Sequence, residues 1–122
     1  MIPYEIYKMI HLLGIFLLFI GISGLLFANA NSPTLKIKLR ILALVTHGLG
    51  LLLIITGGFG MAARLGLTQG LPGWIYAKLG IWLFFGLAFS LSKRKAHWAT
   101  SLVIAYVTMG SAAAYLAIYK PF

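Results

Sequence analysis

Four long apolar stretches follow one another along the chain, separated by short polar segments. They cover residues 4–27, 35–63, 73–91 and 97–119. Each is close to the length of roughly 20 residues that crosses a hydrocarbon core of about 30 Å. Because backbone polar groups in lipid must be hydrogen-bonded within their own segment, each stretch is predicted to be a transmembrane helix.

The three connections span residues 29–34, 66–72 and 92–96. The first contains Asn-Ser-Pro, and the second contains two glycines and a proline, which are ordinary helix breakers. Short connections place consecutive helices side by side and antiparallel. The pattern therefore predicts an all-α polytopic membrane protein, an antiparallel up-down-up-down four-helix transmembrane bundle that forms a single domain over residues 1–122.

Composition excludes a water-soluble globule, since 61% of the residues are hydrophobic and 9% are charged. One acid, Glu5, stands against ten bases. The bases lie at helix ends, so we expect lipid headgroups rather than nucleic acid as their partner. The absence of cysteine excludes disulfides, thiolate metal sites and c-type haem attachment.

The bases are unequally divided between the two sides of the predicted bundle. The first and third connections are flanked by Lys36, Lys38, Arg40, Lys93, Arg94 and Lys95, whereas the other side carries Lys8, Arg64, Lys78 and Lys120. The positive-inside rule predicts that the two basic connections are cytoplasmic and both termini lie outside. The first stretch also resembles a signal peptide ending in Ala28-Asn29-Ala30, but the bases follow it, so we expect a retained helix.

Few ionisable side chains fall within the apolar stretches, and such residues mark functional sites in membrane proteins. His11 lies about two turns into the first helix. It either bonds a neighbouring carbonyl or tyrosine, or serves as a haem or metal ligand. His97, beside three bases, is expected to be a solvated interfacial residue.

His47 lies near the middle of the second helix, where an imidazole needs a partner. The candidates are Thr108, Met109 or Tyr106 across the bundle, or an iron. Gly48 and Gly50 beside it would leave room for a flat ligand or a neighbouring helix.

Lys78 lies one turn into the third helix, between Trp74 and Trp82 at the i−4 and i+4 positions. One interpretation is a cation–π contact with these rings while the stem reaches for the headgroups. The other is a cationic anchor for a carboxylate or propionate of a ligand close to the level of His11.

Other functional classes lack the residues that they require. No carboxylate apart from Glu5 is present for a proton-coupled transporter. The sequence has no paired histidines of metalloprotease type, no nucleophile beside a base and no phosphate loop. These absences exclude zinc hydrolases and NTPases, and no catalytic residue is identified.

A faint internal repeat relates the two halves of the chain. Residues 13–19 resemble residues 79–85, and residues 45–48 resemble residues 107–110. Duplicated hairpins of one orientation would place His47 and Met109 at equivalent positions. Small residues predict the faces where helices pack closely: Gly14, Gly21 and Gly24 in the first helix, Gly50, Gly57 and Gly58 in the second, and Ala105, Ala112 and Ala113 in the fourth.

Three features resemble the small bacterial four-helix membrane proteins of the SirB, HemJ and CopD-like group. These are the segment Lys8-Met9-Ile10-His11, the run from Arg40 to His47, and Trp74-Ile75-Tyr76-Ala77-Lys78-Leu79. The resemblance implies the bacterial inner membrane, and HemJ-type proteins further imply haem b with ligand and substrate roles for His11 and Lys78. The chain differs from HemJ where Phe27-Ala28-Asn29-Ala30 replaces a Pro-Arg pair.

We therefore expect an inner-membrane protein that binds haem b or a related porphyrin in the bundle for redox chemistry or haem handling. The ligands would be His47 with Met109, or His11 alone; a pair of His11 and His47 is strained, because the two lie roughly 10 Å apart in depth. The alternative is a cofactor-free scaffold or subunit that packs against another membrane protein or a second copy of this chain.

Overall fold

The computed structural model describes residues 2–31, 37–67 and 69–121, and the regular secondary structure of these residues is all helical. Its elements are α1 (Tyr4–Asn31), α2 (Ile37–Arg64), α3 (Gly73–Arg94), the short 3-10 helix η1 (Ala96–Trp98) and α4 (Ala99–Tyr119). All four α-helices are long and apolar enough to cross a membrane. The predicted all-α, four-helix fold is confirmed.

Two helices extend by several residues beyond their predicted ends. α1 continues past Phe27 to Asn31, and α3 continues past Leu91 to Arg94. Neither extension contains glycine or proline, so helical hydrogen bonding persists after the apolar stretch has ended. The apolar run marks the thickness of the membrane and does not mark the ends of these two helices. The predicted start of the second helix at Leu35 and the centre of the first connection lie outside the described residues.

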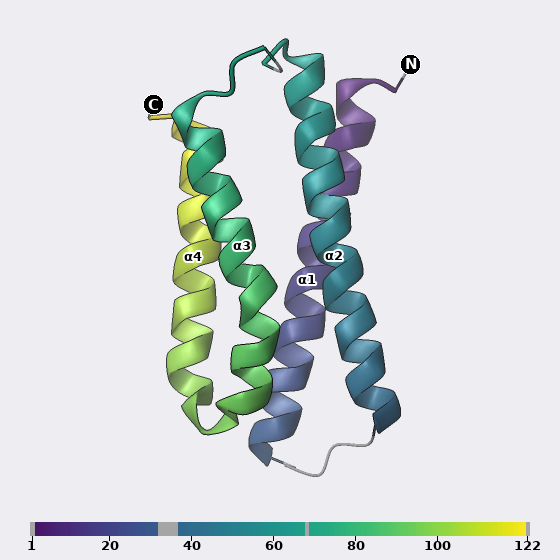
Figure 1. Ribbon diagram of the computed structural model, residues 1–122, viewed down its shortest axis with the longest axis vertical. Helices are drawn as coiled ribbons and strands as arrows, with labels where there is room; N and C mark the ends of the chain where they lie inside the picture. The colour runs from purple at the N-terminus through teal and green to yellow at the C-terminus, as the bar shows by residue number, and fades with distance from the viewer. Residues whose placement is uncertain (1, 32–36, 68, 122) are drawn as a thin grey trace.

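Figure 1 shows two antiparallel hairpins side by side, one made by α1 and α2 and the other by α3 and α4. Both chain ends lie at one end of the bundle. The opposite end is called the basic end here, since among the described residues it carries Lys38, Arg40, Lys93, Arg94 and Lys95.

Glycines bring α1 and α2 into backbone contact. A Cβ atom added at Gly14 would lie 2.7 Å from the Ile54 nitrogen, and one at Gly50 would lie 2.5 Å from the Leu18 nitrogen. Gly21 and Gly57 are equally crowded by the facing helix, whereas Gly24 has nothing within 4 Å. The predicted glycine faces are therefore confirmed at four positions and wrong at Gly24.

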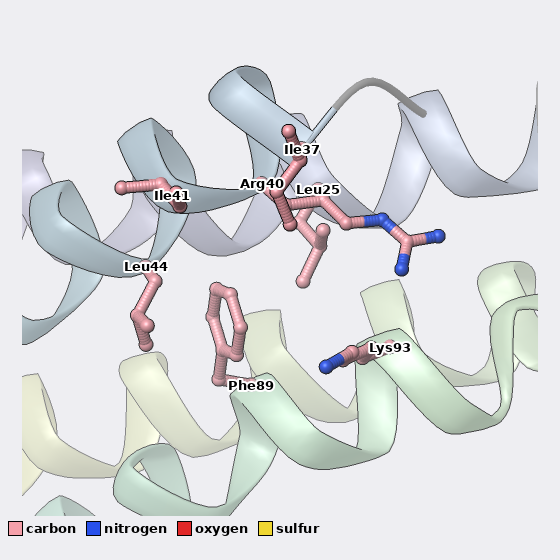
Figure 2. A pocket seen from close by; sticks show the side chains of 7 residues that line it. All are labelled: Leu25, Ile37, Arg40, Ile41, Leu44, Phe89 and Lys93. Carbon is pink, nitrogen blue, oxygen red and sulfur yellow. The ribbon is translucent and has the colours of Figure 1, made fainter. Parts of the chain in front are cut away.

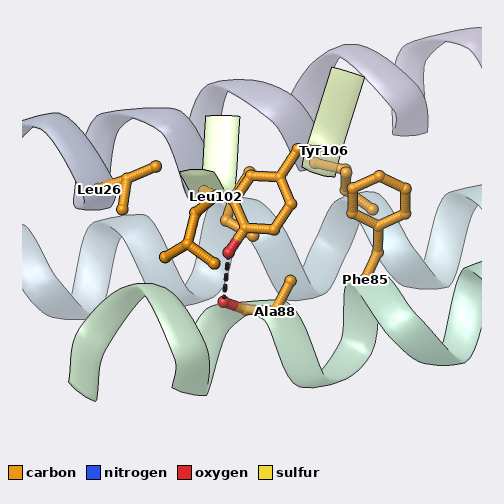
Figure 3. Close-up of a cluster of buried hydrophobic side chains, with 7 residues drawn as sticks. Leu26, Phe85, Ala88, Leu102 and Tyr106 are labelled. Carbon is orange, nitrogen blue, oxygen red and sulfur yellow. Dashed lines mark hydrogen bonds between the residues drawn. The ribbon is translucent and has the colours of Figure 1, made fainter. Parts of the chain in front are cut away.

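The buried core lies between α1, α3 and α4 (Figure 3) and is built from Leu18, Ile22, Leu26, Phe85, Ala88, Leu102 and Tyr106. The Tyr106 hydroxyl donates to the Ala88 carbonyl oxygen at 3.1 Å and lies 2.6 Å from the Ser92 hydroxyl. A buried tyrosine needs such a partner for its polar tip. α3 and α4 are thus joined by large side chains, unlike α1 and α2.

The packing does not reproduce the predicted repeat. Gly14 is buried against α2, while its counterpart Gly80 is exposed and has nothing within 4 Å. Gly48 likewise has open space beside it, while its counterpart Gly110 faces the Phe19 ring. Matching residues in the two halves therefore occupy different environments.

Candidate functional site

His47 is buried at the junction of three helices, with 1% of its surface exposed. Its Nε2 atom lies 2.8 Å from the Phe85 carbonyl oxygen in α3, and its Nδ1 atom lies 3.2 Å from the Leu18 carbonyl oxygen in α1. The prediction that a side chain of the fourth helix is the partner of His47 is therefore wrong. Thr108 donates to the Ile104 carbonyl within α4.

Close helix packing explains why backbone atoms take this role. A Cβ atom at Gly21 would lie 2.7 Å from the backbone nitrogen of His47. α1 therefore lies near enough for the imidazole to reach its carbonyl groups. The ring also packs at 5.7 Å from the Phe89 ring. Both ring nitrogens face carbonyl oxygens of neighbouring helices, so neither points into space that an iron could occupy.

Met109 lies on α4, half-buried against the core cluster. A haem held between His47 and Met109 would require a ring nitrogen of His47 to turn away from the carbonyl oxygen that it faces.

His11 has a different geometry. Its Nδ1 atom lies 2.8 Å from the Ile54 carbonyl oxygen in α2. A carbonyl oxygen only accepts, so Nδ1 carries the proton and Nε2 retains its lone pair. Metal-binding histidines are commonly oriented in this way, with the second ring nitrogen donating to a backbone carbonyl.

Two glycines of α2 make room for the half-buried His11 ring. A Cβ atom at Gly57 would lie 2.7 Å from the backbone nitrogen of His11, and one at Gly58 would lie 3.5 Å from the ring Nδ1. The ring can therefore lie directly against the α2 backbone. A larger residue at Gly57 would push the two helices apart.

Lys78 in α3 is half-buried and close enough to His11 for the two groups to interact electrostatically. The expected contact with two tryptophans is not made among the described residues. The Lys120 ammonium lies 5.6 Å from the centre of the Trp74 ring instead, and the Trp82 Nε1 donates to the Leu51 carbonyl oxygen at 3.0 Å.

The remaining polar side chains were only partly foreseen. His97 is exposed and lies beside Trp98, as expected for an interfacial residue. The buried pair of Ser92 and Tyr106 was missed. Its signal in the sequence is weak: each is a polar group on an otherwise apolar helix face, on helices that a short connection makes antiparallel.

Comparison with protein families, with characterised proteins and with solved structures finds no match to this chain. The resemblance to the SirB, HemJ and CopD-like group stays a prediction. Functional interpretation therefore depends on the geometry of the chain's own residues.

Proposed function

We propose that this chain is a multi-pass protein of the bacterial inner membrane that binds haem b or a related porphyrin through His11, in redox chemistry or haem handling. The observation that supports this most directly is the His11 Nδ1 contact with the Ile54 carbonyl oxygen at 2.8 Å. It leaves Nε2 as the ring atom able to bind iron.

The chain's residues would divide the task of holding the ligand. His11 Nε2 would bind the iron, and the Ile54 carbonyl would hold the imidazole plane in place. The Lys78 ammonium, near His11, can pair with a propionate at the membrane surface. A bound haem b supplies a one-electron iron couple. His47 takes no part, because both of its ring nitrogens face carbonyl oxygens of neighbouring helices.

The orientation that we propose puts the basic end in the cytoplasm and both termini in the periplasm. Five bases among the described residues of that end support it, together with Lys36 in the sequence. His11 and Lys78 then belong to the periplasmic half of the bundle.

Titration of the purified protein with haemin and with iron-free protoporphyrin IX tests the proposal. We expect haemin to give a shifted Soret band and to bind at least about tenfold more tightly, since only haemin can bond to an imidazole nitrogen. Lys78→Gln should weaken both ligands, whereas the exposed Lys8→Gln control at the same end should not. Equal affinity of wild type for the two porphyrins would contradict an iron ligand.

A second candidate is a cofactor-free scaffold or subunit that packs against another membrane protein. The observation that favours it is that three deep polar side chains, His47, Trp82 and Tyr106, all contact backbone carbonyl oxygens of other helices. A protein that stays colourless after expression with ample haem, and does not bind added haemin, would support this function instead.

A further inference from the structure

A small pocket opens at the basic end between α1, α2 and α3, far from His11. It has a volume of about 150 Å³. Figure 2 shows the cationic ends of Arg40, from α2, and Lys93, from α3, toward one end of the pocket, with Phe89 and Leu44 toward the other. We propose that this pocket binds the phosphate group of an anionic phospholipid from the leaflet at the basic end.

Charge is the first argument for this ligand. Two cationic side chains, the half-buried Arg40 and the exposed Lys93, line one pocket from different helices, and two positive charges beside one pocket attract an anion. The only side-chain carboxylate of the chain is Glu5, at the opposite end of the bundle. An anion bound in this pocket would therefore not be a side chain of this protein.

Depth is the second argument. Arg40 lies in the first turn of α2, which begins at Ile37, and Lys93 lies in the last turn of α3, which ends at Arg94. Both are at a helix end, the level at which headgroup phosphates meet a transmembrane bundle. Basic pockets between transmembrane helices are a recognised way to bind anionic lipid headgroups.

The lining of the pocket favours an amphiphile over a free anion. Below the two cations it is apolar, with Leu44 and Phe89 deeper along their helices. Leu44 and Ile41 are each more than half exposed on the outer face of α2, where acyl chains can lie. The volume is below the range of about 300–1,000 Å³ for small-molecule pockets, so we expect only the phosphate and its first methylenes to enter.

Native mass spectrometry in detergent tests this inference by counting lipid bound to each protein molecule. The probes are phosphatidylglycerol, phosphatidylcholine with the same acyl chains, and inorganic phosphate. Wild type should hold phosphatidylglycerol at least about tenfold more tightly than phosphatidylcholine, because the second lipid carries a cation of its own. Arg40→Gln and Lys93→Gln should each reduce phosphatidylglycerol binding by a similar factor, the loss expected for one charged hydrogen bond.

The matched control is the double variant Lys38→Gln/Arg94→Gln. It removes two exposed bases from the same end of the same helices, neither of which lines the pocket, so binding should change less than about threefold. Leu44→Trp retains both charges but fills the apolar part of the pocket, and it should lose the lipid. Helical circular dichroism of each variant separates loss of binding from loss of fold.

Three results would overturn the inference. Equal retention of the two lipids would remove the role of the anionic headgroup. An equal loss in the control variant would attribute binding to the overall charge of the basic end. Displacement of phosphatidylglycerol by millimolar inorganic phosphate, together with unchanged phosphatidylglycerol binding in Leu44→Trp, would identify a site for a free anion rather than a lipid.

Discussion

Backbone carbonyl oxygens in a helix keep one acceptor position after the helical hydrogen bond is made, and several side chains of this protein use it. His11 bonds to the Ile54 carbonyl and Trp82 to the Leu51 carbonyl, and the His47 ring lies within hydrogen-bond distance of the Leu18 and Phe85 carbonyl oxygens. Each bond joins two helices without a second polar side chain. A polar residue within a membrane span can therefore be structural, and its exposure to a ligand depends on which ring atoms remain unused.

Replacing His47 with alanine tests its structural role. The change removes the contacts of the imidazole with two neighbouring helices, where one hydrogen bond is worth about 0.6 kcal/mol on average in membranes, and leaves a cavity at a buried site. We expect a loss of roughly 2 kcal/mol in unfolding free energy, measured by denaturant titration in mixed micelles. The exposed His97→Ala control should remain within about 0.5 kcal/mol of wild type. An unchanged His47→Ala protein would contradict the contacts described for this ring.

At the scale of the helices, the α1–α2 hairpin depends on glycine and the α3–α4 hairpin on larger side chains. The difference follows from where the glycines fall relative to the facing helix. Gly50 meets the α1 backbone, whereas Gly48, two residues away, has nothing within 4 Å.

This pair provides a matched test of close helix packing. Gly50→Ala forces its methyl group against the Leu18 backbone, which cannot move aside as a flexible side chain could, so we expect a loss of at least roughly 1–3 kcal/mol. Gly48→Ala should be neutral. Unfolding of both variants in the same detergent measures the difference. Equal stability of the two would show that α1 and α2 are not in backbone contact.

Much of the helical architecture could be predicted from the sequence, because membrane spans are set by the length of an apolar run. The ends of α1 and α3 could not, since polar residues such as Asn31 and Arg94 remain helical beyond that run. The partners of His47 could not be predicted either. Backbone carbonyls are the same in every sequence, so only the register of three packed helices decides which of them a side chain reaches.

The candidate site was partly predicted for the same reason. A similar depth of His11 and Lys78 was expected from their positions in the sequence, and the two side chains are near enough to interact electrostatically. The pairing of Arg40 and Lys93 in one pocket was not foreseen. Its signal was available: two bases at adjacent ends of antiparallel helices, without an acid nearby.

For the whole molecule, the distribution of bases makes a prediction about orientation in the membrane. Reporters fused after Phe122 should report a periplasmic location, because the larger group of bases lies at the other end of the bundle. An alkaline phosphatase fusion should be active and a green fluorescent protein fusion dark. The reverse pattern would place His11 and Lys78 at the cytoplasmic face.

The absorption spectra of His11→Ala and His47→Ala, purified from membranes supplied with haem, test the central claim most directly. The geometry predicts that His11→Ala loses the Soret band. Its stability should stay close to that of wild type, because only the single bond to Ile54 is lost. It also predicts that His47→Ala retains the band while the protein unfolds more easily. Loss of the band in His47→Ala with retention in His11→Ala would contradict the assignment, and an unchanged spectrum in both would exclude each histidine as the ligand.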